Sequence, residues 1–340
     1  MKNSRLFQIT AGLLLAALGL RIFSRDLDLK DLVARIGSTP FSVIVAAIIL
    51  SIGTLWLRAL RWRILLPLSP KTHKKSLFPI VVVSYMANNI MPARLGEALR
   101  VILLWRKNSY TLTTSIGSLF LERIIDSLVY LSFFFIPVFL SNKLSHLIPY
   151  ARVVAAVFAL CCAGFIAYAV FPSKFIRLLS WLSDRLPEKA GNFLNNKTKE
   201  VMCNLDWVFS PVKVAAVVSL SIIIGFTYSA VILLLAAGSS SLGLLDSLFG
   251  QAFAAFGSAI PLTPGYVGTL HAALRQGLEL TGVSGESAAA IVILYHALPF
   301  ITVTLSGLFF LIGTDITFKD ISHAKEQLKT SKLESENEIF

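Results

Sequence analysis

The residues in this chain best suited to chemistry are charged groups set among apolar ones. Within the stretch LERIID, Glu122, Arg123 and Asp126 interrupt the apolar segment 114–140. A helix would carry Glu122 and Asp126 on one face, because residues four apart lie one above the other. Charged side chains inside an apolar helix are costly unless they are paired or hydrated. The pattern indicates the lining of a polar cavity, or a structural ion-pair cluster.

A second charged group lies upstream, in the stretch NNIMPARLGEALR. Arg94, Glu97 and Arg100 fall within two helical turns, and Glu97 neighbours both arginines. Arginine recognises phosphate through paired hydrogen bonds, whereas the carboxylates can balance that charge or meet an amine. The predicted substrate-binding residues are the polar members of both groups: Asn88, Asn89, Arg94, Glu97, Arg100, Glu122, Arg123 and Asp126.

Two helix-breaking sites share one pattern and lie about half the chain apart. Pro92 is followed by Gly96, and Pro264 is followed by Gly265 and Gly268. Proline removes a backbone donor and clashes with the preceding turn, so each break should divide an apolar stretch into two half-helices. Glycine at such a break permits positive φ or a close approach of the backbone.

Matching breaks in two halves of a chain are typical of transporters that bind substrate between inverted repeats. Non-helical backbone inside a membrane is tolerated only where protein or water satisfies its polar groups. The apolar stretches 76–93 and 247–281 contain these breaks, and we therefore expect 76–100 and 247–275 to form two re-entrant hairpins around a shared, hydrated cavity. The alternative is two unrelated loops at the membrane edge.

The remaining sequence supplies the helices that would hold these groups. The chain is 55% hydrophobic, and long runs without Asp, Glu, Lys or Arg cover 41–57, 153–170, 214–237 and 287–312. A helix needs about 20 such residues to cross a bilayer, so a soluble globular core is excluded. The predicted fold is an all-α polytopic bundle with about six full spans, at 6–23, 41–60, 114–140, 150–171, 213–237 and 287–312.

The net charge of +12 is explained by topology and gives no reason to expect a nucleic-acid partner. With six spans and both termini in the cytoplasm, roughly three quarters of the 31 Lys and Arg residues sort to the cytoplasmic side, as the positive-inside rule requires. The count places Arg58 and Arg61 in the cytoplasmic connection 58–75. The predicted location is the plasma membrane, multi-pass, N-in and C-in.

The longest polar connection, 172–210, begins with an amphipathic pattern. Its apolar residues recur at helical spacing with Trp181 among them, which suits a helix lying in the cytoplasmic interface or packed on protein. The predicted membrane domain is 1–317, and 318–340 forms a polar cytoplasmic tail.

No motif for nucleotide binding, acyl transfer or metal hydrolysis is found, so we expect neither catalytic residues nor cofactors. His271 and His296 lie in apolar sequence without other ligands at metal-binding spacing. We expect each to be a hydrogen-bonded helix-contact histidine.

Three motifs in this order resemble the transmembrane-region family of lysylphosphatidylglycerol synthase/flippase proteins. The family elements P-x-R-x-G-E-x-x-R, E-R-x-x-D and P-G-G-x-G-x-x-E match PARLGEALR, ERIID and PGYVGTLH. Tyr266 and His271 depart from the third element, where the family has Gly and Glu. The resemblance spans about residues 6–315.

The resemblance implies a helical membrane domain with re-entrant hairpins that moves a lipid between leaflets. The soluble aminoacyl-transferase of the best-known members has no counterpart in this sequence, so lipid synthesis is not implied. The expected partners are anionic or zwitterionic phospholipids or a polyprenyl-phosphate-linked lipid, with a glycosyltransferase or a second copy of the chain as protein partner. The alternatives are an enzyme acting on a lipid-linked substrate and a scaffold for a glycosyltransferase.

Overall fold

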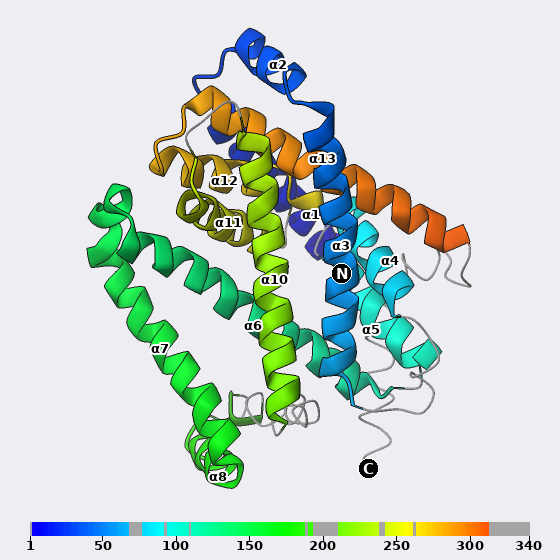
Figure 1. Ribbon diagram of the computed structural model, residues 1–340. Helices are drawn as coiled ribbons and strands as arrows, with labels where there is room; N and C mark the ends of the chain where they lie inside the picture. Colours follow the sequence, from blue (N-terminus) through cyan, green and yellow to red (C-terminus); the bar gives the residue numbers. More distant parts are fainter. Residues whose placement is uncertain are drawn as a thin grey trace.

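The chain is described by a computed structural model that covers residues 2–67, 77–91, 94–108, 110–187, 190–192, 210–237, 242–260 and 263–312 (Figure 1). Within these ranges every regular element is a helix, which confirms the predicted all-α class. The α-helices are α1 (Lys2–Phe23), α2 (Leu29–Gly37), α3 (Phe41–Leu65), α4 (Phe78–Ile90), α5 (Leu95–Asn108), α6 (Leu112–Leu140), α7 (Ile148–Val170), α8 (Pro172–Ser183), α10 (Pro211–Ala236), α11 (Leu244–Ala259), α12 (Thr269–Leu280) and α13 (Gly285–Ile312). Two 3₁₀ helices are η1 (Asn142–Leu147) and η3 (Pro264–Tyr266).

Four helices, α3, α6, α10 and α13, are long and apolar enough to cross a membrane. Their apolar segments have mean hydropathies of 1.8 to 2.3, and only 33–44% of each is buried inside the protein. The remaining apolar side chains face outward, where lipid can cover them. These helices coincide with the predicted spans 41–60, 114–140, 213–237 and 287–312.

Helices α1 and α7 occupy the two other predicted spans, 6–23 and 150–171. They contain 22 and 23 residues, which corresponds to about 33 Å of helix. That length matches a hydrocarbon core of about 30 Å. A full crossing by these two helices stays a prediction.

Helix α3 continues to Leu65, beyond the predicted end of its span. Arg58 and Arg61 therefore lie inside a membrane-length helix, and their placement at the cytoplasmic end of the span stays a prediction. They are 5% and 0% exposed, and both donate hydrogen bonds to the Asp126 carboxylate on α6. Pairing with a carboxylate offsets the cost of taking a guanidinium out of water, so the helix does not have to end before them.

The first interrupted stretch forms a hairpin of two helices, α4 and α5. Helix α4 ends at Ile90 and α5 begins at Leu95; the predicted breaking residue Pro92 lies outside the described residues. Gly96 lies so close to the Ser84 carbonyl of α4 that an added Cβ would overlap it. The glycine thus allows the two arms of the hairpin to meet backbone to backbone.

The second interrupted stretch forms a matching hairpin, α11 and α12, with η3 between them. Pro264 begins η3, as expected for a residue that pre-sets φ and needs no donor. Gly265 and Gly268 have φ of 56° and 86°, in the left-handed region where a Cβ is unfavourable. The helical backbone is therefore interrupted between Ala259 and Thr269.

The two sets of four helices, α3–α6 and α10–α13, repeat one packing pattern. Helix α4 packs on α13, and its counterpart α11 packs on α6. Helix α5 packs on α6 as α12 packs on α13, while α3 and α10 pack on each other. Exchanging the two sets therefore reproduces the same set of neighbours, with α3 and α10 side by side at the centre (Figure 1).

The other helices lie around this core. Helix α1 packs on α12, and α2 packs on α13. Helices α7 and α8 extend from the end of α6 and η1 to the edge of the molecule (Figure 1). On α8, Leu178, Trp181 and Leu182 are exposed, which leaves an apolar face for the interface or for a partner.

Candidate functional site

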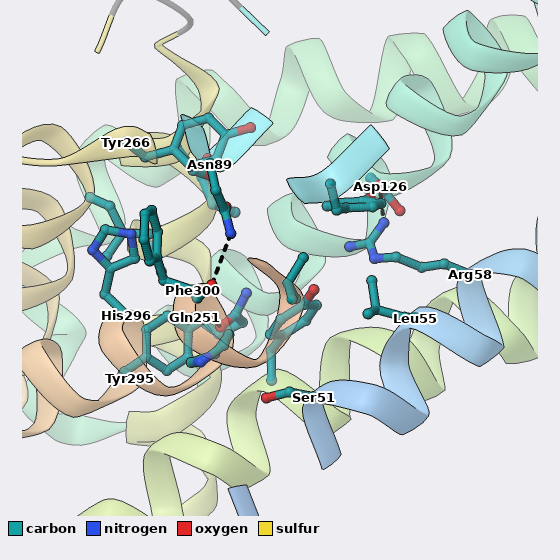
Figure 2. A pocket seen from close by; sticks show the side chains of 18 of the residues that line it. Ser51, Leu55, Arg58, Asn89, Asp126, Gln251, Tyr266, Tyr295, His296 and Phe300 are labelled. Carbon is teal, nitrogen blue, oxygen red and sulfur yellow. Dashed lines mark hydrogen bonds and ion pairs between the residues drawn. The ribbon is translucent and has the colours of Figure 1, made fainter. Parts of the chain in front are cut away.

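A cavity of about 190 Å³ lies among the membrane-length helices and the two hairpins. Figure 2 shows Arg58 and Asp126 on one side of it, and Asn89, Tyr266 and His296 on the other. Seven helices and η3 contribute to its wall, together with Arg94 just before α5. The lining residues are Ser51, Leu55, Arg58, Tyr85, Asn89, Arg94, Arg123, Asp126, Tyr130, Tyr228, Gln251, Ala254, Ala255, Ser258, Tyr266, Leu270, Tyr295, His296, Pro299, Phe300 and Val303.

Behind the wall, Glu122 of α6 collects several arginines. It pairs with Arg100 of α5 at 2.9 Å and with Arg61 of α3 at 3.5 Å. Arg58 lies 3.6 Å from the same carboxylate. The Arg100 guanidinium also stacks 3.8 Å above the Trp62 ring. Glu122 is fully buried, so these contacts replace its hydration and link α3, α5 and α6.

One helical turn further along α6, Asp126 connects these arginines to the cavity wall. Arg61 donates to its Oδ1 at 2.6 Å, and Arg58 donates to its Oδ2 at 3.2 Å. Arg61 also donates to the Ser221 hydroxyl of α10 at 3.0 Å, so this contact joins both sets of helices. The predicted shared face of Glu122 and Asp126 is confirmed.

The exposed side of the system is formed by Arg94, Glu97 and Arg123. Glu97 lies 3.4 Å from Arg94 and 3.8 Å from Arg123, and Arg123 also pairs with Glu122 at 3.0 Å. The side chains of Arg94 and Arg123 are 20% and 35% exposed, so water or a ligand can reach them. We call these linked groups the arginine–carboxylate network: Arg58, Arg61, Arg94, Arg100, Arg123, Glu97, Glu122 and Asp126.

Arg94 and Tyr266 occupy equivalent places in the two hairpins, each two residues after the breaking proline. Both have left-handed backbone, with φ of 50° and 61°, which is uncommon for residues other than glycine. The Arg94 guanidinium lies 5.8 Å from the centre of the Tyr266 ring and donates to the Ser258 carbonyl at 2.6 Å. Backbone strain of this kind persists where the surroundings hold it and clusters at functional sites.

The opposite wall is neutral and aromatic. The Asn89 amide donates to the Phe300 carbonyl at 3.2 Å (Figure 2). His296 lies 3.3 Å from His271, ring nitrogen to ring nitrogen. The prediction that both are hydrogen-bonded helix-contact histidines is confirmed. Tyr295 donates to Gln251 at 2.6 Å.

The predicted site residues divide into three groups. Asn89, Arg94, Arg123 and Asp126 line the cavity. Glu97 pairs with Arg94 and Arg123 at the exposed side of the network, and Arg100 and Glu122 pair with each other behind the wall. Asn88 is buried against Gly96 within the first hairpin and does not line the cavity.

The predicted structural glycines pack closely. Gly265 approaches the Asn89 carbonyl, where an added Cβ would lie 2.9 Å from the oxygen. Gly268 lies against the backbone of Ala16 in α1, and Gly19 faces Gly268 in return. Both positions therefore require the absence of a side chain as well as positive φ.

Arg58, Arg61 and five cavity tyrosines were not predicted as site residues. A signal was available for the arginines, because they lie three apart on one face at the end of an uninterrupted apolar run. The tyrosines Tyr85, Tyr130, Tyr228, Tyr266 and Tyr295 come from five different elements. No local spacing relates them, so only the tertiary structure brings them together.

The sequence comparison agrees with this geometry. Residues 9–307 match the family model described as the lysylphosphatidylglycerol synthase TM region. The chain belongs to this family. The match includes both hairpins and every residue of the arginine–carboxylate network.

Two curated relatives share parts of the chain. The UPF0104 membrane protein MJ1078 of Methanocaldococcus jannaschii is 26% identical over 238 residues, which cover 67% of this chain and 95% of the relative. Glycosyltransferase AglD of Haloferax volcanii is 28% identical over 126 residues, 37% of this chain and 20% of that protein. No solved structure matches the chain.

Proposed function

We propose that this protein is a lipid translocase that holds a polar head group in the cavity while the acyl chains stay in the bilayer. The observation that carries the proposal is the cavity itself, lined by Arg58, Arg94, Arg123 and Asp126 among membrane-length helices. Ionisable side chains at membrane depth mark substrate or ion pathways. A structural cluster needs no adjoining space, whereas this one opens onto 190 Å³.

The cavity size favours a head group over a whole lipid. A cavity of 190 Å³ accommodates a small polar group together with water molecules. Drug-sized ligands occupy pockets of about 300–1,000 Å³. Acyl chains would therefore remain outside, against the apolar surfaces of the surrounding helices.

The architecture suits alternating access. In the proposal six helices span the membrane, and α4–α5 and α11–α12 are re-entrant hairpins in inverted orientation. The repeated packing pattern of α3–α6 and α10–α13 supports two related halves around a shared site. The membrane domain would extend over 1–317 in the plasma membrane, with both termini, the connection 172–210 and the tail 318–340 in the cytoplasm.

Each part of the predicted site has a role in the proposal. Arg94 and Arg123, at the exposed side of the network, would receive the phosphate of the head group, because guanidinium groups suit phosphate geometry. Arg100 would support them from behind through Glu122. Pro92, Gly96, Pro264, Gly265 and Gly268 would form the hinges and close contacts of the hairpins.

Reconstitution into liposomes tests the function. Purified protein is inserted into vesicles with a fluorescent phospholipid in both leaflets, and a membrane-impermeant quencher reports the fraction that becomes accessible from outside. We expect the accessible fraction to exceed that of protein-free vesicles, and Arg123→Ala to return it toward that level. Equal quenching with and without protein, across anionic, zwitterionic and polyprenyl-phosphate lipids, would refute translocation.

An accessory role beside a glycosyltransferase is the second candidate. It is favoured by the match to glycosyltransferase AglD, whose name indicates a sugar-transfer reaction. A scaffold would bind its enzyme without moving lipid, and an enzyme acting on a lipid-linked substrate would yield a new product. Mass spectrometry of the same vesicles distinguishes a new product from translocation alone.

A further inference from the structure

The arginine–carboxylate network is not electrically neutral. In the described part of the chain it joins five arginines to three carboxylates through a continuous set of ion pairs. Two positive charges are left over, and the cavity wall itself carries three of the arginines but one carboxylate. An uncompensated charge in a membrane interior is costly, so the site is built to receive negative charge.

None of the three carboxylates is available to a cationic ligand. Glu122 pairs with four arginines, and Asp126 pairs with three. Glu97 lies between Arg94 and Arg123. An ammonium group entering the cavity would have to displace a guanidinium from its partner and would add to an existing positive excess.

The aromatic rings that line the cavity are also unsuited to a cationic ligand. Aromatic rings can bind a quaternary ammonium over their faces, but Arg58 already lies 5.4 Å from the Tyr85 ring centre and 5.6 Å from that of Tyr228. Arg94 lies over Tyr266 in the same way. These rings therefore already serve the protein's own cations.

Several donors around the cavity are unused. The Nε groups of Arg58, Arg94 and Arg123 and the Tyr85 hydroxyl are buried, and none has a hydrogen-bond partner among the described residues. All four residues line the cavity. Buried donors without partners are rare and costly, so these side chains gain hydrogen bonds if they turn toward a cavity ligand rich in acceptor oxygens.

We propose that the head group bound here is a dianionic lipid phosphate, either a phosphomonoester or a diphosphate, that carries no cationic group. A phosphomonoester carries about −1.5 to −2 charges at pH 7, which matches the excess of two positive charges in the network. Phosphodiester lipids carry one negative charge, and zwitterionic lipids add an ammonium. The proposal rests on the proposed function, because a lipid head group has to reach the cavity.

Binding to the purified full-length chain tests the head-group class. Native mass spectrometry compares dioleoyl phosphatidic acid, phosphatidylglycerol and phosphatidylcholine at pH 7.5, since these share acyl chains and differ only in head group. We expect phosphatidic acid to bind about tenfold or more tightly than either of the others, the effect of one extra charge-assisted hydrogen bond. Equal or tighter binding of phosphatidylglycerol or phosphatidylcholine would overturn the proposal.

Inorganic pyrophosphate distinguishes a lipid ligand from a soluble one. A lipid phosphate site is expected to bind phosphatidic acid. Millimolar pyrophosphate then either displaces this lipid or has no effect on its binding. Binding of pyrophosphate without any binding of phosphatidic acid would assign the cavity to a soluble anion and overturn the lipid assignment.

Two cavity variants and two matched controls locate the binding. Tyr85→Phe removes only the unused hydroxyl, and Arg123→Gln removes one charge from a side chain that is about one-third exposed. We expect Tyr85→Phe to weaken phosphatidic acid binding by about tenfold and Arg123→Gln by at least as much, without change for phosphatidylcholine. Tyr150→Phe and Arg25→Gln, both exposed and remote from the cavity, should have no effect.

An unchanged preference for phosphatidic acid in both cavity variants would overturn the assignment of the site. The binding readout is also separate from transport. Selective binding of phosphatidic acid without translocation would refute the proposed function and leave the head-group assignment standing. Translocation of all three lipids without selective binding would support the proposed function and refute the head-group assignment.

Discussion

The two hairpins have one architecture and opposite chemistry. In the first, Arg94, Glu97 and Arg100 follow the break and enter an ion-pair network. In the second, the residues at the same distances from the proline are Tyr266, Thr269 and Ala272, none of them charged. The helices packed beside them differ similarly, because Glu122 and Asp126 lie on α6 and the α13 residues that line the cavity are uncharged.

The comparison separates what the fold needs from what the ligand needs. Close backbone approach at Gly96 and at Gly268 is common to both hairpins, so it belongs to the architecture. At the three positions that follow the break, charge is confined to the first hairpin, so it belongs to the site. A symmetric scaffold with one charged half can hold an anion on one side and present neutral donors and aromatic surface on the other.

The first prediction is all-or-none and concerns the opposite orientation of the two halves. Single cysteines at Ser38, Lys189 and Ser331 are introduced after replacing the three native cysteines, then labelled with a membrane-impermeant maleimide in intact cells and in inverted vesicles. We expect Lys189 and Ser331 to react only from the cytoplasmic side and Ser38 only from outside. An external Lys189 would overturn the topology and the inverted repeat with it.

The second prediction is the largest energetic one and breaks the charged half. Glu122→Ala leaves several buried arginines without their partner, which typically costs about 3–5 kcal/mol. We expect a strongly lowered melting temperature, loss of translocation and retained membrane insertion. Asp126→Ala should lower the melting temperature slightly less.

Glu279 of the second hairpin is the matched control, because it pairs with Arg275 at 2.7 Å but is one-third exposed. Glu279→Ala should cost about 1 kcal/mol or less. A Glu122→Ala protein that melts and transports normally would make the network dispensable.

The third prediction compares the close contacts of the two hairpins. Gly96→Ala introduces a methyl group against the Ser84 carbonyl and should cost about 1–3 kcal/mol. Gly268→Ala should cost more, because it adds overlap with Ala16 to an unfavourable positive φ.

Two glycines with open space separate these effects. Gly282 has φ of 92° and nothing within 4 Å of an added Cβ, and Gly53 is helical with equally free surroundings. Gly282→Ala therefore reports the backbone cost alone, and Gly53→Ala should be slightly stabilising. A higher melting temperature for Gly268→Ala than for Gly282→Ala would show that the hairpin does not require close approach at Gly268.

The smallest effect is the direct coupling between equivalent positions. A double-mutant cycle with Arg94→Ala and Tyr266→Ala should give an interaction energy of about 0.5–1 kcal/mol for the guanidinium–ring contact. Unfolding in sodium dodecyl sulfate measures it. Strict additivity would mean that the two residues share a position in the repeat without interacting.

The sequence predicted the helices and breaks well, because both depend on local patterns. Apolar runs of membrane length gave α3, α6, α10 and α13, and Pro264 with its glycines gave the break before α12. Within the site, Glu122 and Asp126 were identified because charge in an apolar helix is conspicuous.

The rest depends on contacts distant in sequence. Arg58 and Arg61 lie at the end of an apolar run, where basic residues usually mark the membrane boundary. Only the tertiary structure shows that both are buried and pair with Asp126. Nothing local distinguishes Tyr85 or Tyr228 from any other aromatic residue in a membrane helix, and Gln251 becomes meaningful only where α11 meets α13.

The contact between α1 and the second hairpin has a consequence for biosynthesis. Gly19 meets the backbone of Gly268, and Arg275 donates to the carbonyls of Phe23 and Arg25. At about 5–20 residues per second, ribosomes need roughly 10 to 50 s between making the first glycine and making the second. The first helix to emerge must therefore wait until nearly the whole of the family domain has been made before it can dock.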